Sequence, residues 1–73
     1  MKKIKIIDLL NIIAQNGKVP KKITYNLLKE EYKILIWDKE EQEYRFENYP
    51  EEFWDGVPNH HLNDYVEILE SEE

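Results

Sequence analysis

Alternating apolar and polar side chains predict most of the strands of this chain. Between residues 2 and 7, lysine and isoleucine alternate, a period of two that is typical of a short strand with one face in solvent. The same period recurs in four further segments, which we expect to be strands: residues 21–26, 32–37, 43–47 and 65–70. The segment 32–37 is also rich in β-branched and aromatic residues, which favour strands.

One segment has the period of an amphipathic helix. Its apolar side chains recur at spacings of three and four residues, at Leu9, Leu10, Ile12 and Ile13. Asp8 stands where an N-cap residue belongs, and Asn16 and Gly17 tolerate the left-handed conformation that ends many helices. The pattern therefore predicts a helix of about two turns over residues 9–16.

The polar run 38–42 predicts a turn between two strands. It separates segments 32–37 and 43–47, so these two are expected to form an antiparallel hairpin. The segment Leu27–Glu31 fits either a helical turn, because Leu, Lys and Glu favour helix, or a connection between strands. We favour the connection.

A second short helix is expected between the hairpin and the last strand. Residues 51–55 fit one helical turn that carries Phe53 and Trp54, and Gly56 and Pro58 end it. The expected order is thus β-α-β-β-β-short α-β. This order predicts an α+β fold in which a small, strongly twisted, mainly antiparallel sheet packs against one N-terminal helix.

The inward positions of these segments predict the hydrophobic core. We expect the core to consist of Ile4, Ile6, Leu9, Leu10, Ile13, Ile23, Ile34, Ile36, Phe46, Val66 and Ile68. In the segment 32–37 this choice places Tyr32, Ile34 and Ile36 on the buried face, and Leu35 and Trp37 on the other.

Length and composition indicate one small globular domain over residues 1–73. The chain is 41% hydrophobic and 36% charged, and no apolar stretch approaches the ~20 residues that cross a bilayer. It has no cysteine, so stability must come from packing or from a partner subunit. The apolar start resembles a signal peptide, but Asp8 interrupts it and no small-residue cleavage site follows. We therefore expect a cytoplasmic protein.

Charge is distributed unevenly along the sequence. Residues 1–34 hold eight basic and three acidic groups, a net +5, whereas residues 35–73 hold two basic and thirteen acidic groups, a net −11. In so small a domain this asymmetry predicts a surface with one acidic face. Such a face repels nucleic acid and attracts a protein partner with a basic surface. We expect no membrane partner, since no long apolar stretch is present.

The sequence offers little for catalysis or metal binding. The one serine, Ser71, lies near the C-terminus and cysteine is absent, so a nucleophilic triad has no credible nucleophile. His60, His61 and Asp64 are the only cluster with metal-ligand character, and they lack a further His or Cys to complete a coordination shell. We expect a solvated loop there, no cofactor and no enzymatic activity.

Aromatic and acidic residues are interleaved between residues 37 and 55. Six of the nine aromatic side chains share these nineteen residues with eight carboxylates. A small domain buries only some of these rings, so one or two are expected to remain exposed as anchors for a partner. The alternative is that the rings form the core. The candidate protein-binding residues are Trp37, Glu40, Glu41, Tyr49, Glu51, Glu52 and Trp54.

Three segments share a pattern with known sequences: IKIIDLLNxIA at residues 4–14, GxVPKKI at residues 17–23 and LNDxVEILE at residues 62–70, where x is any residue. With these segments the chain resembles a family of short uncharacterised proteins of phages and prophages of low-GC Gram-positive bacteria. The middle of the chain departs from this pattern. The resemblance implies an accessory protein of the bacterial cytoplasm, and it transfers no functional residue.

The leading hypothesis is a non-enzymatic accessory protein that binds a host or phage protein through an acidic and aromatic face. One version is an inhibitor that imitates DNA, for instance against a host defence protein, because carboxylates spaced over a sheet can occupy a groove that evolved for phosphates. The alternative is a structural module that forms a homodimer through its sheet.

Overall fold

The computed structural model describes residues 2–71 as one nine-residue helix, two short 3₁₀ turns and six strands. In chain order these are β1 (Lys2–Lys5), α1 (Ile6–Ala14), β2 (Lys22–Thr24), η1 (Glu30–Tyr32), β3 (Ile34–Asp38), β4 (Glu43–Phe46), β5 (Tyr49–Trp54), η2 (Asn59–His61) and β6 (Tyr65–Glu70). The α+β class and the N-terminal helix predicted from the sequence are confirmed.

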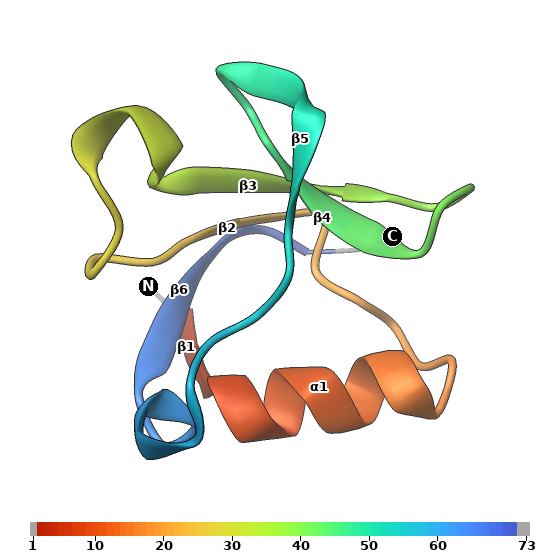
Figure 1. Cartoon of the computed structure of the whole chain (residues 1–73). Coiled ribbons are helices and arrows are strands. Elements are labelled where there is room, and N and C mark those ends of the chain that lie inside the picture. Colours follow the sequence, from red (N-terminus) through yellow and green to blue (C-terminus); the bar gives the residue numbers. More distant parts are fainter. Residues whose placement is uncertain (1, 72–73) are drawn as a thin grey trace.

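All six strands form one antiparallel sheet in the order β1-β6-β2-β3-β4-β5. β6 lies between β1 and β2, and α1 connects these two strands across one face. From β2 onward the chain runs as a meander to β5, at the far edge of the sheet. Figure 1 shows the direction of the strands changing strongly from β6 to β3, with α1 on one side of the sheet.

The helix begins earlier than its apolar pattern predicts. Its N-cap residue is Lys5, which makes no side-chain cap. The first two amides of the helix instead donate to backbone carbonyls in the segment before β6. The amide of Ile6 donates to the carbonyl of Asp64, and that of Ile7 to the carbonyl of Leu62, each at 2.9 Å. Tertiary contacts thus satisfy the first two free amides of the helix, and Asp8 is not its N-cap. Asp8 lies in the first turn, where a carboxylate favours the helix dipole.

The end of the helix agrees with the prediction. Asn16 has a φ of 55°, in the left-handed region, just beyond the last helical turn. The amide of Gly17 then donates to the carbonyl of Ile12 at 2.9 Å. This bond satisfies one of the free carbonyls that a helix leaves at its C-terminus.

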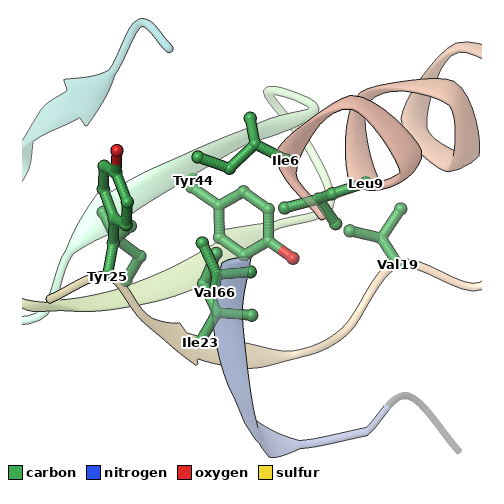
Figure 2. Close-up of a cluster of buried hydrophobic side chains, with 8 residues drawn as sticks. Ile6, Leu9, Val19, Ile23, Tyr25, Tyr44 and Val66 are labelled. Carbon is green, nitrogen blue, oxygen red and sulfur yellow. The ribbon is translucent and has the colours of Figure 1, made fainter. Parts of the chain in front are cut away.

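The core lies between α1 and the sheet. Its buried members are Ile6, Leu9, Val19, Ile23, Tyr25, Leu35, Tyr44 and Val66. In Figure 2 the ring of Tyr44 lies among the aliphatic side chains of Ile6, Leu9, Ile23 and Val66. Four predicted core residues are therefore confirmed as buried, and four others pack half-buried against the cluster: Ile4, Ile13, Phe46 and Ile68.

Two parts of the core prediction are wrong. In β3 it is Leu35 that is fully buried, opposite Ile23 of β2, and so Ile34 and Ile36 lie half-buried on the outer face of the sheet. Because side chains alternate along a strand, assigning one residue to the wrong face of the sheet assigns all the others in that strand to the wrong face. In α1, Leu10 is 37% exposed because Ile6 and Leu9 occupy the buried face of the helix.

The expected helical turn at residues 51–55 is also wrong. This segment belongs to β5, which pairs with β4 through Tyr44 and Trp54 at one end and Phe46 and Tyr49 at the other. Between these pairs β5 has several more residues than β4, so its middle bulges outward; Figure 1 shows the bend. In the connection Leu27–Glu31, a turn leads into η1, which begins at Glu30.

Candidate protein-binding site

The seven predicted binding residues lie along the meander β3–β4–β5 but do not form one surface. Glu40 and Glu41 follow β3, in the turn next to the Tyr44–Trp54 pair. The other end of β4 carries the pair formed by Phe46 and Tyr49, together with the bulge of β5. The structure therefore separates the set into two groups: Trp37, Glu40, Glu41 and Trp54, and Tyr49, Glu51 and Glu52.

In the first group, both tryptophans are partly in the core and partly accessible. The ring of Trp37 packs edge-on against Tyr44, with centroids 5.0 Å apart, and the Trp54 ring lies 6.3 Å from Tyr44 and 5.9 Å from Tyr25. Both side chains are half-buried. Binding and core interpretations of these residues are thus compatible, because one part of each ring packs inward while another remains at the surface.

A groove of about 280 Å³ opens between α1 and this part of the sheet. Its apolar lining includes Leu10 and Ile13 from the helix, and Trp37, Phe53 and Trp54 from the meander. We call it the helix–meander groove. Leu10 is 37% and Phe53 54% exposed, so these two side chains present apolar surface at the groove.

The charged residues that line the helix–meander groove are acidic. They are Glu43 at the start of β4 and Asp55 just after β5, and none of the described lining residues is basic. Glu43 makes an ion pair with Arg45, Oε2 to Nη2 at 2.8 Å, whereas Asp55 is exposed. The groove is therefore apolar at its base and negatively charged at its edge. Sequence reasoning missed Leu10 because its spacing assigned it to the core.

The turn next to the groove is held by Asp38. Its Oδ1 accepts hydrogen bonds from the amides of Glu40 and Glu41, at 3.0 and 3.3 Å, and its Oδ2 accepts one from Nε of Arg45 at 3.0 Å. The backbone amide of Glu41 has the largest effect in lowering the pKa of Asp38, and the Glu40 amide and Arg45 lower it further. Glu40 and Glu41 are consequently displayed in solvent on an ordered turn.

The second group surrounds a pair of stacked tyrosines. The Tyr49 ring stacks on that of Tyr32 with centroids 4.9 Å apart, and Phe46 meets Tyr32 edge-on at 5.0 Å. Desolvation raises the pKa of Tyr32, and the charges of Glu52 and Glu31 raise it further. The two rings cover each other, so this cluster presents mainly ring edges and carboxylates to a partner.

Outside the predicted set, His61, Asp64 and Tyr25 form a hydrogen-bonded chain. Nδ1 of His61 lies 2.7 Å from Oδ2 of Asp64, which also accepts a bond from the hydroxyl of Tyr25 at 3.3 Å. Burial, followed by the charge of Asp64, raises the pKa of Tyr25. These contacts fasten the segment whose carbonyls cap α1. The ring of His60 lies beside that of His61 at a tilt of 46°, with centroids 4.1 Å apart. Within residues 2–71, no group of three His, Cys, Asp or Glu could hold a metal ion.

A larger hollow, of about 420 Å³, lies on the meander and is lined by Ile36, Asp38, Arg45, Glu47 and Pro50 among others. Arg45 is fully engaged there, with Asp38, with Glu43 and with the carbonyl of Pro50 at 3.1 Å. Charges of both signs line this hollow and neutralise one another. Trp37 and Glu40 of the predicted set also line this hollow, which differs from the helix–meander groove in containing basic as well as acidic residues.

No family model, curated protein or solved structure matches this chain. In the part of the chain that the structure describes, no helix combines the length and the apolar character needed to cross a bilayer.

Proposed function

We propose that this protein is a non-enzymatic binding protein whose acidic and aromatic meander, residues 37–55, contacts a partner protein with a basic surface. The observation that carries the proposal is the helix–meander groove, where exposed apolar side chains meet acidic groups with no basic residue in the described lining. Aromatic side chains in partly desolvated hollows are typical anchors of protein interfaces, and surrounding charges steer association.

The charge distribution supports a basic partner. The net charge of the protein is −6, and thirteen of its sixteen acidic residues follow residue 34. The structure places Glu40 and Glu41 in solvent on the turn beside the groove. Charges at the rim of an interface act over long range, so they accelerate association with an oppositely charged partner and lose this effect at high ionic strength.

The proposed setting is a bacterial cell that carries a phage or prophage, as the resemblance of the N-terminal and C-terminal segments implies. In this setting the partner would be a host or phage protein with a basic surface. Inhibition of a nucleic-acid-binding defence protein is one form of this proposal, because such a protein presents basic groups for phosphates.

The test is affinity capture from a bacterial lysate, followed by elution with rising salt. The informative variant reverses Glu40 and Glu41 to Lys, and the matched control reverses Glu30 and Glu31, another adjacent exposed pair. Both variants change the net charge equally. We expect the first variant to lose most of the salt-eluted partner and the control to retain it.

Two results would contradict the proposal. In one, both variants capture the same proteins as the wild type, which would make the acidic meander a solvated surface. In the other, light scattering finds a tight homodimer that covers Trp54 and captures no further protein. That result would favour a structural module that pairs through its sheet.

A further inference from the structure

We infer that the helix–meander groove binds an apolar side chain, aromatic or leucine-like, presented by a lysine- or arginine-rich segment of the partner. This inference rests on the proposed function and assigns it a site and a ligand chemistry.

The size of the groove indicates what fits. Its volume of about 280 Å³ lies at the lower limit of the ~300–1,000 Å³ that is usual for pockets of small molecules. One or two side chains therefore fill it, whereas a nucleotide or a large cofactor does not. Side chains presented by a protein segment are the occupants that match this scale.

The lining indicates an apolar occupant. Leu10 projects from α1, and Phe53 and Trp54 come from the end of β5, so the hollow has walls on two different elements. Ile13 and Trp37 pack against the hydrophobic core from the same groove. Because the core fixes these side chains, the groove is available without rearrangement, and a partner avoids the entropic cost of forming it.

The charges indicate that the apolar occupant is flanked by basic residues. Asp55 is exposed at the groove, and Glu43 has only its Oε2 paired with Arg45. Glu40 and Glu41 lie on the adjoining turn. An acidic segment would meet like charges at Glu43 and Asp55, whereas lysine or arginine would meet complementary ones.

The sheet edge next to the groove disfavours binding by strand addition. β5 is an edge strand, but its middle bulges away from β4 and contains Pro50, Glu51 and Glu52. Proline, charged side chains and bulges are the features by which edge strands avoid pairing with another chain. The partner is therefore expected to contact side chains in the groove and not the backbone of β5.

The test is a titration with three capped hexapeptides, namely Lys-Lys-Phe-Leu-Lys-Lys, Glu-Glu-Phe-Leu-Glu-Glu and Lys-Lys-Ala-Ala-Lys-Lys. None contains tryptophan, so any change in tryptophan emission comes from Trp37 and Trp54, the two tryptophans of the protein. Amide shifts in NMR spectra of the full chain locate the binding site. We expect the first peptide to change the tryptophan emission and to shift residues of the groove such as Leu10, Ile13 and Trp54.

Matched variants then separate the groove from the rest of the surface. Phe53→Ser removes an exposed wall of the groove, and Leu27→Ser removes a comparably exposed side chain from the connection after β2. We expect Phe53→Ser to weaken binding of the first peptide about tenfold, the size of a modest hot spot, and Leu27→Ser to leave it unchanged. Asp55→Asn is expected to weaken binding at low salt and to have little effect at high salt.

Several outcomes overturn the inference. Equal binding of the acidic peptide removes the requirement for basic flanks, and equal binding of the alanine peptide removes the apolar anchor. If the amide shifts are confined to Tyr32 and Tyr49, the binding site lies at the other end of the meander. If the first peptide does not bind, the groove is not a binding site for such segments. Shifts of groove residues that follow protein concentration without peptide identify a second copy as the occupant.

Failure of this inference is distinguishable from failure of the proposed function. If Phe53→Ser captures the partner normally while reversal of Glu40 and Glu41 abolishes capture, the acidic meander is the binding region and the groove is not the site. If neither variant changes capture, the proposed function itself is wrong.

Discussion

The two halves of the sheet differ in how completely the helix covers them. Over β6 and β2, the helix buries its partners fully, and Ile6, Leu9, Ile23 and Val66 have no exposed surface. Over β3 and β4, Leu35 and Tyr44 are buried as well, but Trp37 and Trp54, toward the end of the helix, remain half-buried and line a groove.

Simple dimensions explain this difference. A helix of nine residues is about 13.5 Å long, whereas six strands spaced at about 4.8 Å span about 24 Å from the first to the last. One such helix cannot cover the whole sheet. The part of the sheet beyond its reach is also the part that is rich in aromatic and acidic residues. The covered half therefore supplies most of the stability, and the uncovered half is the surface available for binding.

The difference between the two halves is tested most directly by truncating two adjacent leucines of α1. Leu9 is fully buried and Leu10 is 37% exposed at the groove. We expect Leu9→Ala to lower the free energy of unfolding by about 2 to 5 kcal/mol, the usual cost of truncating a buried leucine. Leu10→Ala is expected to cost about 1 kcal/mol or less, because much of its side chain already contacts water.

Urea unfolding, followed by circular dichroism, measures both variants of this pair. Ile12→Ala, in the same helix and half-buried, is the control for a change in helix propensity. Equal losses for Leu9 and Leu10 would mean that the helix is rotated relative to the sheet, so that both leucines lie in the core.

The second prediction concerns the aromatic residue that connects the two halves. Tyr44 is 2% exposed, and its hydroxyl donates to the carbonyl of Pro20 at 2.7 Å. Tyr44→Phe leaves this carbonyl without its donor, so we expect a loss of about 1 to 3 kcal/mol in the free energy of unfolding. Tyr65→Phe, at an exposed position, is the matched control. Equal stability of the two variants would show that water replaces the hydroxyl.

Much of this fold could be predicted from the sequence, because its signals are local. Asn16, predicted to end the helix, has the left-handed conformation and lies two residues after the last helical residue, Ala14. The hairpin of β3 and β4 follows from the polar run between two alternating segments. β6 agrees with the predicted bounds 65–70.

The predictions were wrong where contacts between residues distant in sequence determine the local structure. In β3 both faces carry large apolar side chains, so alternation alone gave no basis for choosing Leu35 over Ile34 and Ile36 as the buried phase. The start of α1 is fixed by carbonyls of residues 62 and 64, which are distant in sequence. β5 has a large bulge, which removes the period of two that would have identified it as a strand.

The candidate site was predictable in composition but not in geometry. The interleaving of acidic and aromatic residues in the meander predicted Trp37 and Trp54 as binding residues, and both line the groove. The contribution of the helix, through Leu10 and Ile13, follows only from the packing of α1 against the sheet. The separation of Tyr49, Glu51 and Glu52 from the groove follows from the register of β5.

The third prediction is a loss of stability in alkali that depends on the two tyrosines of the core, Tyr25 and Tyr44. Burial raises the pKa of Tyr44, and burial together with the charge of Asp64 raises that of Tyr25. The folded protein therefore holds protons that the unfolded chain releases above its ordinary tyrosine pKa of about 10. The contribution of these tyrosines to stability is expected to be constant below about pH 9, so the stability should fall from there as the pH rises further.

Urea midpoints between about pH 8 and 11.5 measure this effect, and Tyr44→Phe should reduce the slope. Tyr65→Phe, the exposed control, should leave the slope unchanged. A slope that is the same in all three proteins would mean that Tyr44 is not the residue that ionises on unfolding.

The last and smallest expected effect lies in the uncovered half, at the turn after β3. The amides of Glu41 and Glu40, together with Arg45, stabilise the charged form of Asp38 and lower its pKa below the ordinary value. The contribution of this carboxylate to stability is thus present above the unfolded pKa of about 4 and is lost as the pH falls through the lower, folded value. Asp38→Asn should therefore flatten the acid part of the profile of unfolding free energy against pH. The change at neutral pH should be smaller than for either core variant.

The same variant should also weaken binding of the lysine-flanked phenylalanine peptide, because the turn carries Glu40 and Glu41 beside the groove. The control Glu67→Gln in β6 should leave peptide binding and the acid part of the stability profile unchanged. If Asp38→Asn alters binding without altering the acid profile, the turn is held by other contacts and Asp38 acts on the peptide directly through its charge.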